Sequence, residues 1–291
     1  MAQAPASWHC TALPIIGGMR RVLLAALTLM ISNALHAGTL TDDLKLLAHE
    51  RIYFGHQSVG KNVLDGLQEL SVAAGVPLRI AELPRAADLD GPGVGHLFVP
   101  ENGDPLRKLA EFKRALGTGS QADIALVKFC YVDIDAHTDM RALFDEYRQT
   151  IDELRKANPR TTFVHVTLPL TTVQTGPKAW VKRLLGRAPY GTVENVKREQ
   201  YNALLRRTYT GREPIFDLAR LESIAADGTQ ASVEWDGVVA PAMAAAYTDD
   251  GGHLNHAGRL RAAKEFVATI AAARRPQQFQ DSAATAVRFS R

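Results

Sequence analysis

Two short stretches of the sequence contain residue types that together could carry out nucleophilic chemistry. The first reads FGHQSVG, in which Ser58 follows an apolar run and precedes residues with helical spacing. A serine hydroxyl is a weak nucleophile until a neighbouring base takes its proton. In a turn from a strand into a helix the hydroxyl would be accessible, and the helix N-terminus would offer N–H groups to a developing oxyanion. A serine that only caps the helix fits equally well, so this stretch alone leaves both interpretations open.

The second stretch, YTDDGGHLNHAGR, places Asp250 three residues before His253, across two glycines. A carboxylate at this spacing can accept the Nδ1–H of the imidazole, fix its tautomer and stabilise the imidazolium. The glycines at 251 and 252 remove side chains that would obstruct so tight a turn. A loop that caps the last helix through Asn255 explains part of the segment, but it does not explain the spacing of Asp and His. The pair therefore favours Ser58 as a nucleophile with His253 as its base.

Alternating strand and helix patterns would bring the two stretches together. Continuous apolar runs typical of buried strands cover Ile52–Phe54, Leu78–Ile80, Ile124–Phe129, Phe163–Leu168 and Ile215–Leu218. Apolar residues with helical spacing lie between these runs. The alternation predicts an α/β fold, namely a three-layer α/β/α sandwich with a central parallel, flavodoxin-like sheet of about five strands. Ligands of such sheets bind beyond the carboxyl ends of the strands, where Ser58 would lie.

A serine after the first strand and an Asp-x-x-His pair before the last helix resemble the SGNH, or GDSL-like, serine hydrolase family. The resemblance covers roughly residues 52–272. It implies that Ser58 is the nucleophile, that His253 is the general base and that Asp250 orients the histidine. It further implies an esterase or deacetylase that hydrolyses carboxylic esters through an acyl-enzyme, with no cofactor and no metal ion.

Two blocks of the sequence depart from the family's pattern. The usual Gly-Asp-Ser is one residue longer here, and His56 and Gln57 precede the serine, where they could bind substrate. The family's Gly-x-Asn-Asp aligns with CYVD at 130–133, so its glycine and its oxyanion-hole asparagine are both absent. An oxyanion donor is worth roughly 3–4 kcal/mol of barrier, so another group should replace it. The amide of Asn102 and the backbone N–H of Gly103 are the candidates, although both residues also suit a plain turn before a helix.

The N-terminal part of the sequence predicts export. From Met19 it contains two arginines, an apolar run and small residues, which is typical of a secretory signal peptide over 19–37. Residues 1–18 are then expected to be a non-native extension upstream of the true start. Cleavage would leave a hydrolase-like domain over 38–273 and a flexible tail over 274–291, with no stable membrane span. The expected location is the periplasm or the outside of the cell.

Composition limits the partners of the mature chain. Loss of Arg20 and Arg21 with the signal leaves 32 basic residues against 31 acidic ones, so charge gives no argument for nucleic-acid binding. Cys130 would be the only remaining cysteine, which excludes an intrachain disulfide. The segment 171–195 is basic and rich in glycine and proline, and it predicts either a solvated surface excursion or a lid over the site.

Several alternatives stay open beside the esterase. The same site would be an O-acetyltransferase if a sugar hydroxyl replaced water. A non-catalytic glycan-binding protein on the same scaffold would fit the missing asparagine. A metal-dependent hydrolase could use Asp249, Asp250, His253 and His256, if the fold brought them together. The expected substrate is a small-molecule or polysaccharide ester, with acetylated glycans and lipid esters as the two classes considered.

Overall fold

The computed structural model describes residues 40–275 of the chain. Within it, the residues from Asp42 onward belong to one compact unit. The predicted extension 1–18, the predicted signal peptide 19–37 and residues 276–291 of the predicted tail lie outside the described residues. In the described part, no helix combines the length and the apolar character needed to cross a bilayer.

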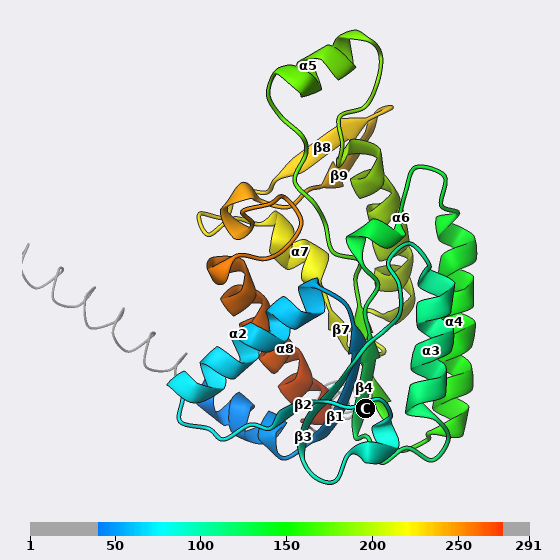
Figure 1. Cartoon of the computed structure of the whole chain (residues 1–291), viewed down its shortest axis with the longest axis vertical. Helices are drawn as coiled ribbons and strands as arrows, with labels where there is room; N and C mark the ends of the chain where they lie inside the picture. The colour runs from blue at the N-terminus through cyan, green and yellow to red at the C-terminus, as the bar shows by residue number, and fades with distance from the viewer. Residues whose placement is uncertain (1–39, 276–291) are drawn as a thin grey trace, which may run out of the picture. The chain divides into compact units, whose positions relative to one another are not determined.

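A five-stranded parallel sheet forms the centre of the fold, in the order β2-β3-β1-β4-β5 (Figure 1). Ile52 in the first strand is in register with Val94 on one side and with Ile124 on the other, so β1 lies in the middle. A short parallel pair, β6 with β7, follows on from β5. The strands are β1 (Arg51–His56), β2 (Ile80–Glu82), β3 (Gly93–Phe98), β4 (Ile124–Val127), β5 (Thr162–Phe163), β6 (His165–Val166) and β7 (Ile215–Phe216).

Helices cover both faces of the sheet (Figure 1). The helices α2 (Val59–Ala73) and α8 (His256–Arg274) pack together on one face. On the other face lie α3 (Pro105–Leu116), α4 (Met140–Ala157) and α6 (Thr192–Tyr209). The shorter helices are α5 (Pro177–Leu184) and α7 (Leu218–Ser223), with 3-10 turns η1 (Ala86–Asp88), η2 (Tyr131–Asp133) and η3 (Ala245–Tyr247).

Neighbouring aromatic residues of β1 serve the two opposite layers, because successive side chains of a strand point to opposite faces. The ring of Tyr53 stacks against Phe112 of α3, with the ring centroids 6.2 Å apart. The ring of Phe54 packs against Phe266 of α8, at 6.0 Å between centroids. All four side chains are wholly buried. These layers confirm the predicted three-layer α/β/α sandwich.

The order of the strands determines where a ligand could bind. From β1 the chain passes through α2 to β2 and β3 on one side, and it then returns through α3 to β4 on the other side. In open α/β sheets, ligands bind beyond the carboxyl ends of the strands at such a reversal. The residues that follow β1 and β4 are therefore those best placed for chemistry.

The sequence does not predict β3, and it places β2 too early. Gly93, Gly95 and His96 interrupt the apolar pattern of β3, and glycine is disfavoured in strands. A glycine is nevertheless required at 93, where φ is 132° and a Cβ would lie 2.6 Å from the carbonyl oxygen of Arg79. The strand expected at Leu78–Ile80 begins only at its last residue and continues to Glu82.

An antiparallel hairpin, β8 (Ser232–Trp235) with β9 (Val238–Pro241), is also absent from the prediction. The strands turn at Asp236 and Gly237, with φ of 49° and 74°. Two successive positive φ values at an Asp-Gly pair are typical of a two-residue hairpin turn. The hairpin packs against α6, outside the five-stranded sheet.

Candidate active site

Ser58 lies in the turn between β1 and α2. The strand ends at His56 and the helix begins at Val59, so the serine directly precedes the helix. Its φ of 22° and ψ of −84° lie outside the regions that residues with a Cβ ordinarily adopt. Its side chain makes no capping hydrogen bond to the helix. The geometry therefore disfavours the capping role and holds the serine in a strained turn, as is common at functional sites.

A hydrogen bond joins His253 to Asp250 within one tight turn. Nδ1 of His253 lies 2.6 Å from Oδ2 of Asp250. The other carboxylate oxygen accepts hydrogen bonds from the backbone N–H groups of Gly252 and His253, at 2.9 and 2.8 Å. Burial alone would raise the pKa of Asp250, but the hydrogen bonds from His253 and from the backbone outweigh it and hold that pKa well below its ordinary value. The ionised carboxylate keeps the imidazole proton on Nδ1 and leaves Nε2 as a base.

Tyr131 lies at the Nε2 side of His253. Its hydroxyl is 3.4 Å from that nitrogen, and the two rings meet edge to face with their centroids 5.6 Å apart. A Cβ at Gly252 would lie 2.6 Å from Cζ of Tyr131, so the glycine admits the ring. Burial, assisted by the negative charge of Asp250, raises the pKa of Tyr131 to about 12, and the hydroxyl is therefore a proton donor at neutral pH. Sequence reasoning did not identify Tyr131, although its place in the block 130–133 was a signal.

Arg198 of α6 fixes the position of Tyr131. Arg198 is 1% exposed, and its guanidinium donates a hydrogen bond of 2.9 Å from Nη2 to the backbone oxygen of Tyr131. It also lies 5.9 Å from the centroid of the tyrosine ring. Further hydrogen bonds run from Nη1 to Asn195 at 2.7 Å and to Thr171 at 3.0 Å. The tyrosine is thus held by a buried cation whose own hydrogen bonds are satisfied.

The turn that contains His253 is tied to the helix that follows Ser58. Asn62, in the first turn of α2, accepts a hydrogen bond of 3.2 Å from the backbone N–H of Leu254. The backbone N–H of Asn62 donates in turn to the carbonyl of Ser58, at 3.1 Å. Two segments that are 192 residues apart in the sequence therefore meet at the start of α2.

The hydroxyl of Ser58 lies 3.9 Å from Sγ of Cys130, the buried residue before Tyr131. Ser58, Tyr131 and His253 therefore gather where β1 and β4 end. Among the described residues, Ser58 and His253 share no hydrogen bond, and Nε2 of the histidine faces Tyr131 instead. Catalytic hydrogen bonds are often long before substrate binds and shorten in the complex.

The predicted oxyanion donors, Asn102 and Gly103, are held next to the end of β4. The N–H of Gly103 donates to Oδ1 of Asp133 at 2.8 Å, so this donor already has an acceptor. The side-chain oxygen of Asn102 accepts from Nζ of Lys108 at 2.9 Å, which leaves its Nδ2 as the remaining donor. Lys108 and Asp133 form a wholly buried ion pair at 2.7 Å. The pair fixes this loop, since breaking a buried ion pair leaves an uncompensated charge.

His56 and Gln57, expected to contact substrate, instead support the serine turn from the protein side. His56 is wholly buried, and its Nε2 lies 3.1 Å from Nδ1 of His96. Burial, followed by the nearby positive charges of His96 and Lys128, lowers the pKa of His56 to about 2, so the ring is neutral. Gln57 donates from Nε2 to the backbone oxygen of Val99. These positions favour packing roles for both residues.

The side chains named for a metal site have separate partners. Nε2 of His256 lies 2.7 Å from Glu69 on α2. Asp249 accepts a hydrogen bond of 3.3 Å from Asn255. Asp250 and His253 bind each other. Across residues 40–275, no cluster of three or more His, Cys, Asp or Glu side chains is arranged to hold a metal ion.

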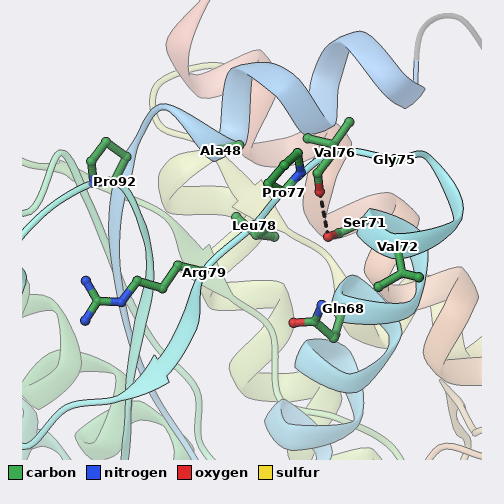
Figure 2. Close-up of a pocket in the computed structure, with 10 residues that line it drawn as sticks. All are labelled: Ala48, Gln68, Ser71, Val72, Gly75, Val76, Pro77, Leu78, Arg79 and Pro92. Carbon is green, nitrogen blue, oxygen red and sulfur yellow. Dashed lines mark hydrogen bonds between the residues drawn. The ribbon is translucent and has the colours of Figure 1, made fainter.

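A surface pocket lies on another part of the molecule, between the end of α2 and the segment before β2 (Figure 2). Gln68, Ser71 and Arg79 are among its lining residues. The hydroxyl of Ser71 is already bound to the carbonyl of Val76, at 2.8 Å. None of the candidate catalytic side chains lines this pocket.

Comparison with known proteins gives structural likenesses at low identity. No family model and no curated protein matches the sequence. The fold is similar to that of a GDSL-like lipase from Bacteroides thetaiotaomicron, with a TM-score of 0.44 and 10% identity over 76% of this chain and 86% of the other. It is also similar to a family 3 carbohydrate esterase from Clostridium thermocellum, with a TM-score of 0.42 and 12% identity over 76% and 94%. The function proposed below therefore rests on the geometry of this chain's own side chains.

Proposed function

We propose that the chain is an exported serine esterase of SGNH type, which hydrolyses carboxylic esters through an acyl-enzyme. The proposal is carried by the 2.6 Å hydrogen bond between Asp250 and His253, which leaves Nε2 of the histidine as a base where β1 and β4 end. Ser58 supports it, because its hydroxyl does not cap α2 and its backbone is strained at this edge of the sheet. The predicted signal peptide over 19–37 supports export.

The proposed reaction has two steps with balanced proton transfers. Nε2 of His253 takes the proton of the Ser58 hydroxyl as Oγ bonds to the ester carbonyl carbon. The alcohol leaves with that proton, and the acyl group stays on the serine. A water molecule then gives a proton to Nε2 and attacks the acyl carbon, which releases the acid and restores the hydroxyl. Asp250 stabilises the imidazolium in both steps.

Tyr131 replaces the missing asparagine in this proposal. Its protonated hydroxyl lies 3.4 Å from Nε2 of His253. When the Ser58 hydroxyl takes its place at Nε2, the phenol turns to donate to the oxyanion. At the start of α2 the N–H groups of Gly60 and Asn62 are bound to the carbonyls of Gln57 and Ser58, so those of Val59 and Lys61 are the second source of donors. Nδ2 of Asn102 is the remaining side-chain donor of the pair expected from the sequence.

The proposed substrates are small-molecule or polysaccharide esters, with acetylated glycans first. An O-acetyltransferase is the variant of this proposal in which a sugar hydroxyl replaces water. One observation favours a second candidate function, a non-catalytic glycan-binding protein: the N–H of Gly103 is already bound to Asp133. If the other proposed donors do not reach the oxyanion either, the serine would not react.

Hydrolysis of p-nitrophenyl acetate distinguishes the two candidate functions. The wild-type protein is expected to turn over the ester, and Ser58→Ala is expected to lose turnover. Ser232→Ala is the matched control, since that serine is exposed on β8. No turnover by the wild type, together with retained binding of an acetylated glycan, would favour the non-catalytic protein.

A further inference from the structure

The segment between β6 and α6 carries positive charge without acidic residues. From residue 171 to 193 it contains no aspartate or glutamate, and its basic residues are Lys178, Lys182, Arg183 and Arg187. Helix α5 forms within it and lies at the top of Figure 1, away from the central sheet. None of the four cations forms a salt bridge with another described residue. The segment is therefore a source of uncompensated positive charge.

Large apolar side chains of α5, and of the residue after it, face the solvent. Trp180, Val181, Leu184 and Leu185 are 63%, 46%, 70% and 65% exposed. At about 100° per residue they fall within an arc of about 140°, and the buried Ala179 lies on the opposite side of the helix. The apolar stripe thus points away from the protein, which is the reverse of a helix that packs on a core.

The base of the segment is fastened beside the candidate active site. The N–H of Gln174 donates to the carbonyl of Tyr190 at 2.9 Å, and this hydrogen bond joins the two ends of the segment in a narrow neck. The N–H of Thr172 donates to the carbonyl of Gly251 at 2.9 Å, within the turn that carries His253. A surface that bound α5 would therefore be connected to the site through a short, hydrogen-bonded neck.

We propose that helix α5 docks on a lipid bilayer that contains anionic lipids. An exposed apolar face bordered by lysine and arginine is typical of helices that lie in the bilayer interface. Trp180 and the two leucines enter the boundary between headgroups and acyl chains, and the flanking cations stay with the anionic headgroups. The inference does not depend on the proposed catalytic role of Ser58.

A polyanionic polysaccharide is the other partner that these cations would attract. Its sugar rings are hydrated and offer little to aliphatic side chains, which gain free energy by leaving water for hydrocarbon. Of the four exposed apolar side chains, Val181, Leu184 and Leu185 are aliphatic. The composition of the exposed face therefore favours lipid.

Tryptophan fluorescence tests the proposal at the helix itself. In a full-length chain with Trp8→Phe and Trp235→Phe, Trp180 is the one remaining tryptophan. Vesicles of phosphatidylcholine and phosphatidylglycerol, in a ratio of about 7:3, are expected to shift its emission to the blue. Brominated acyl chains should quench it, and about 0.5 M salt should weaken the binding through screening.

Two variants separate the charged and apolar contributions. The triple variant Lys178→Gln/Arg183→Gln/Arg187→Gln should bind the anionic vesicles roughly a hundredfold more weakly than the wild type. The double variant Leu184→Ser/Leu185→Ser should bind them at least about tenfold more weakly. Val72→Ser removes an aliphatic side chain of similar exposure, 71%, on the distant end of α2, and it should change nothing. Circular dichroism checks that the fold is retained.

Three results would overturn the proposal: no binding of the anionic vesicles, binding that leaves Trp180 unquenched, or equal binding of pure phosphatidylcholine vesicles. The second result also covers attachment through any other part of the chain. Binding of dextran sulfate in place of vesicles would overturn it in favour of a polyanionic glycan.

Discussion

The two sides of the candidate active site are prepared to different degrees. On one side, Asp250 already holds His253 by a 2.6 Å hydrogen bond, and its second oxygen is bound to two backbone N–H groups. On the other side, the Ser58 hydroxyl lies 3.9 Å from a cysteine sulfur, and the N–H of Gly103 is already bound to Asp133. The proposed base is therefore preformed, whereas the proposed nucleophile and oxyanion donors must still be brought into place.

Removal of the base should have the largest effect. In His253→Ala, kcat for p-nitrophenyl acetate should fall at least about ten-thousandfold, because Ser58 then has no proton acceptor. His256→Ala is the matched control, since that histidine is bonded to Glu69 and should leave kcat within about twofold. A similar loss of kcat in both variants would show that the activity depends on the structure of the turn around His253 and not on His253 as a base.

Neutralising the orienting carboxylate should have the next largest effect. Asp250→Asn keeps an oxygen for the backbone N–H groups, but it removes the charge that stabilises the imidazolium. We expect kcat to fall roughly a thousandfold or more, with KM nearly unchanged. A loss below about tenfold would mean that the preformed pair does not drive the chemistry.

Tyr131→Phe tests the less prepared side. Loss of one oxyanion donor costs about a hundredfold or more in kcat, with little change in KM. Tyr209→Phe, at the far end of α6, is the control, because the hydroxyl of Tyr209 has no hydrogen-bond partner among the described residues. If the phenol only packs against His253, Tyr131→Phe should match that control within about threefold, and another donor must then be sought.

The buried histidine beside Ser58 predicts that stability depends on pH. Burial lowers the pKa of His56 to about 2, whereas the unfolded chain takes up this proton near its ordinary value of 6.5. His56 therefore costs the folded state no stability above about pH 6.5. As pH falls from 6.5 toward 2, the unfolded chain takes up the proton and the folded protein does not, so the folded state loses stability relative to the unfolded state. His56 alone should lower the free energy of unfolding by up to about 1.4 kcal/mol per pH unit in this range, whereas Glu222, whose pKa burial raises to about 8, acts in the opposite direction.

Urea unfolding at about pH 7, 6 and 5 measures this decrease. In His56→Phe the part of this decrease that comes from His56 should be missing, since the phenyl ring cannot take up a proton in either state, so wild type should lose more stability than the variant as pH falls from 7 to 5. An equal slope in both proteins would contradict the assignment of a neutral, buried His56.

The central layers of the fold were predictable because buried parallel strands must be continuously apolar, as β1 and β4 are. The strand β3 was not predictable, because its glycines reflect contacts with a neighbouring segment and not the preferences of a strand. A Cβ at Gly93 would lie 2.6 Å from the carbonyl oxygen of Arg79, and this contact cannot be inferred from the neighbouring residues in the sequence. Local strand propensity therefore failed to predict β3, because the residue type there is set by packing against another segment of the chain.

The same division applies to the candidate site. The hydrogen bond between Asp250 and His253 spans three residues, so the spacing of the sequence is enough to anticipate it. The approach of Tyr131 to His253 spans 122 residues and depends on the order of the strands. The fate of the Gly103 N–H depends on where the buried carboxylate of Asp133 lies, which no local spacing predicts.

Covalent labelling tests the central claim, that Ser58 is an activated nucleophile, most directly. The wild-type protein is treated with a fluorophosphonate, and the adduct is located by intact-mass measurement and peptide mapping. We predict one adduct, on Ser58, which is absent in Ser58→Ala and retained in Cys130→Ala. An adduct on any other residue, or turnover of an ester by Ser58→Ala at the wild-type rate, would contradict the account.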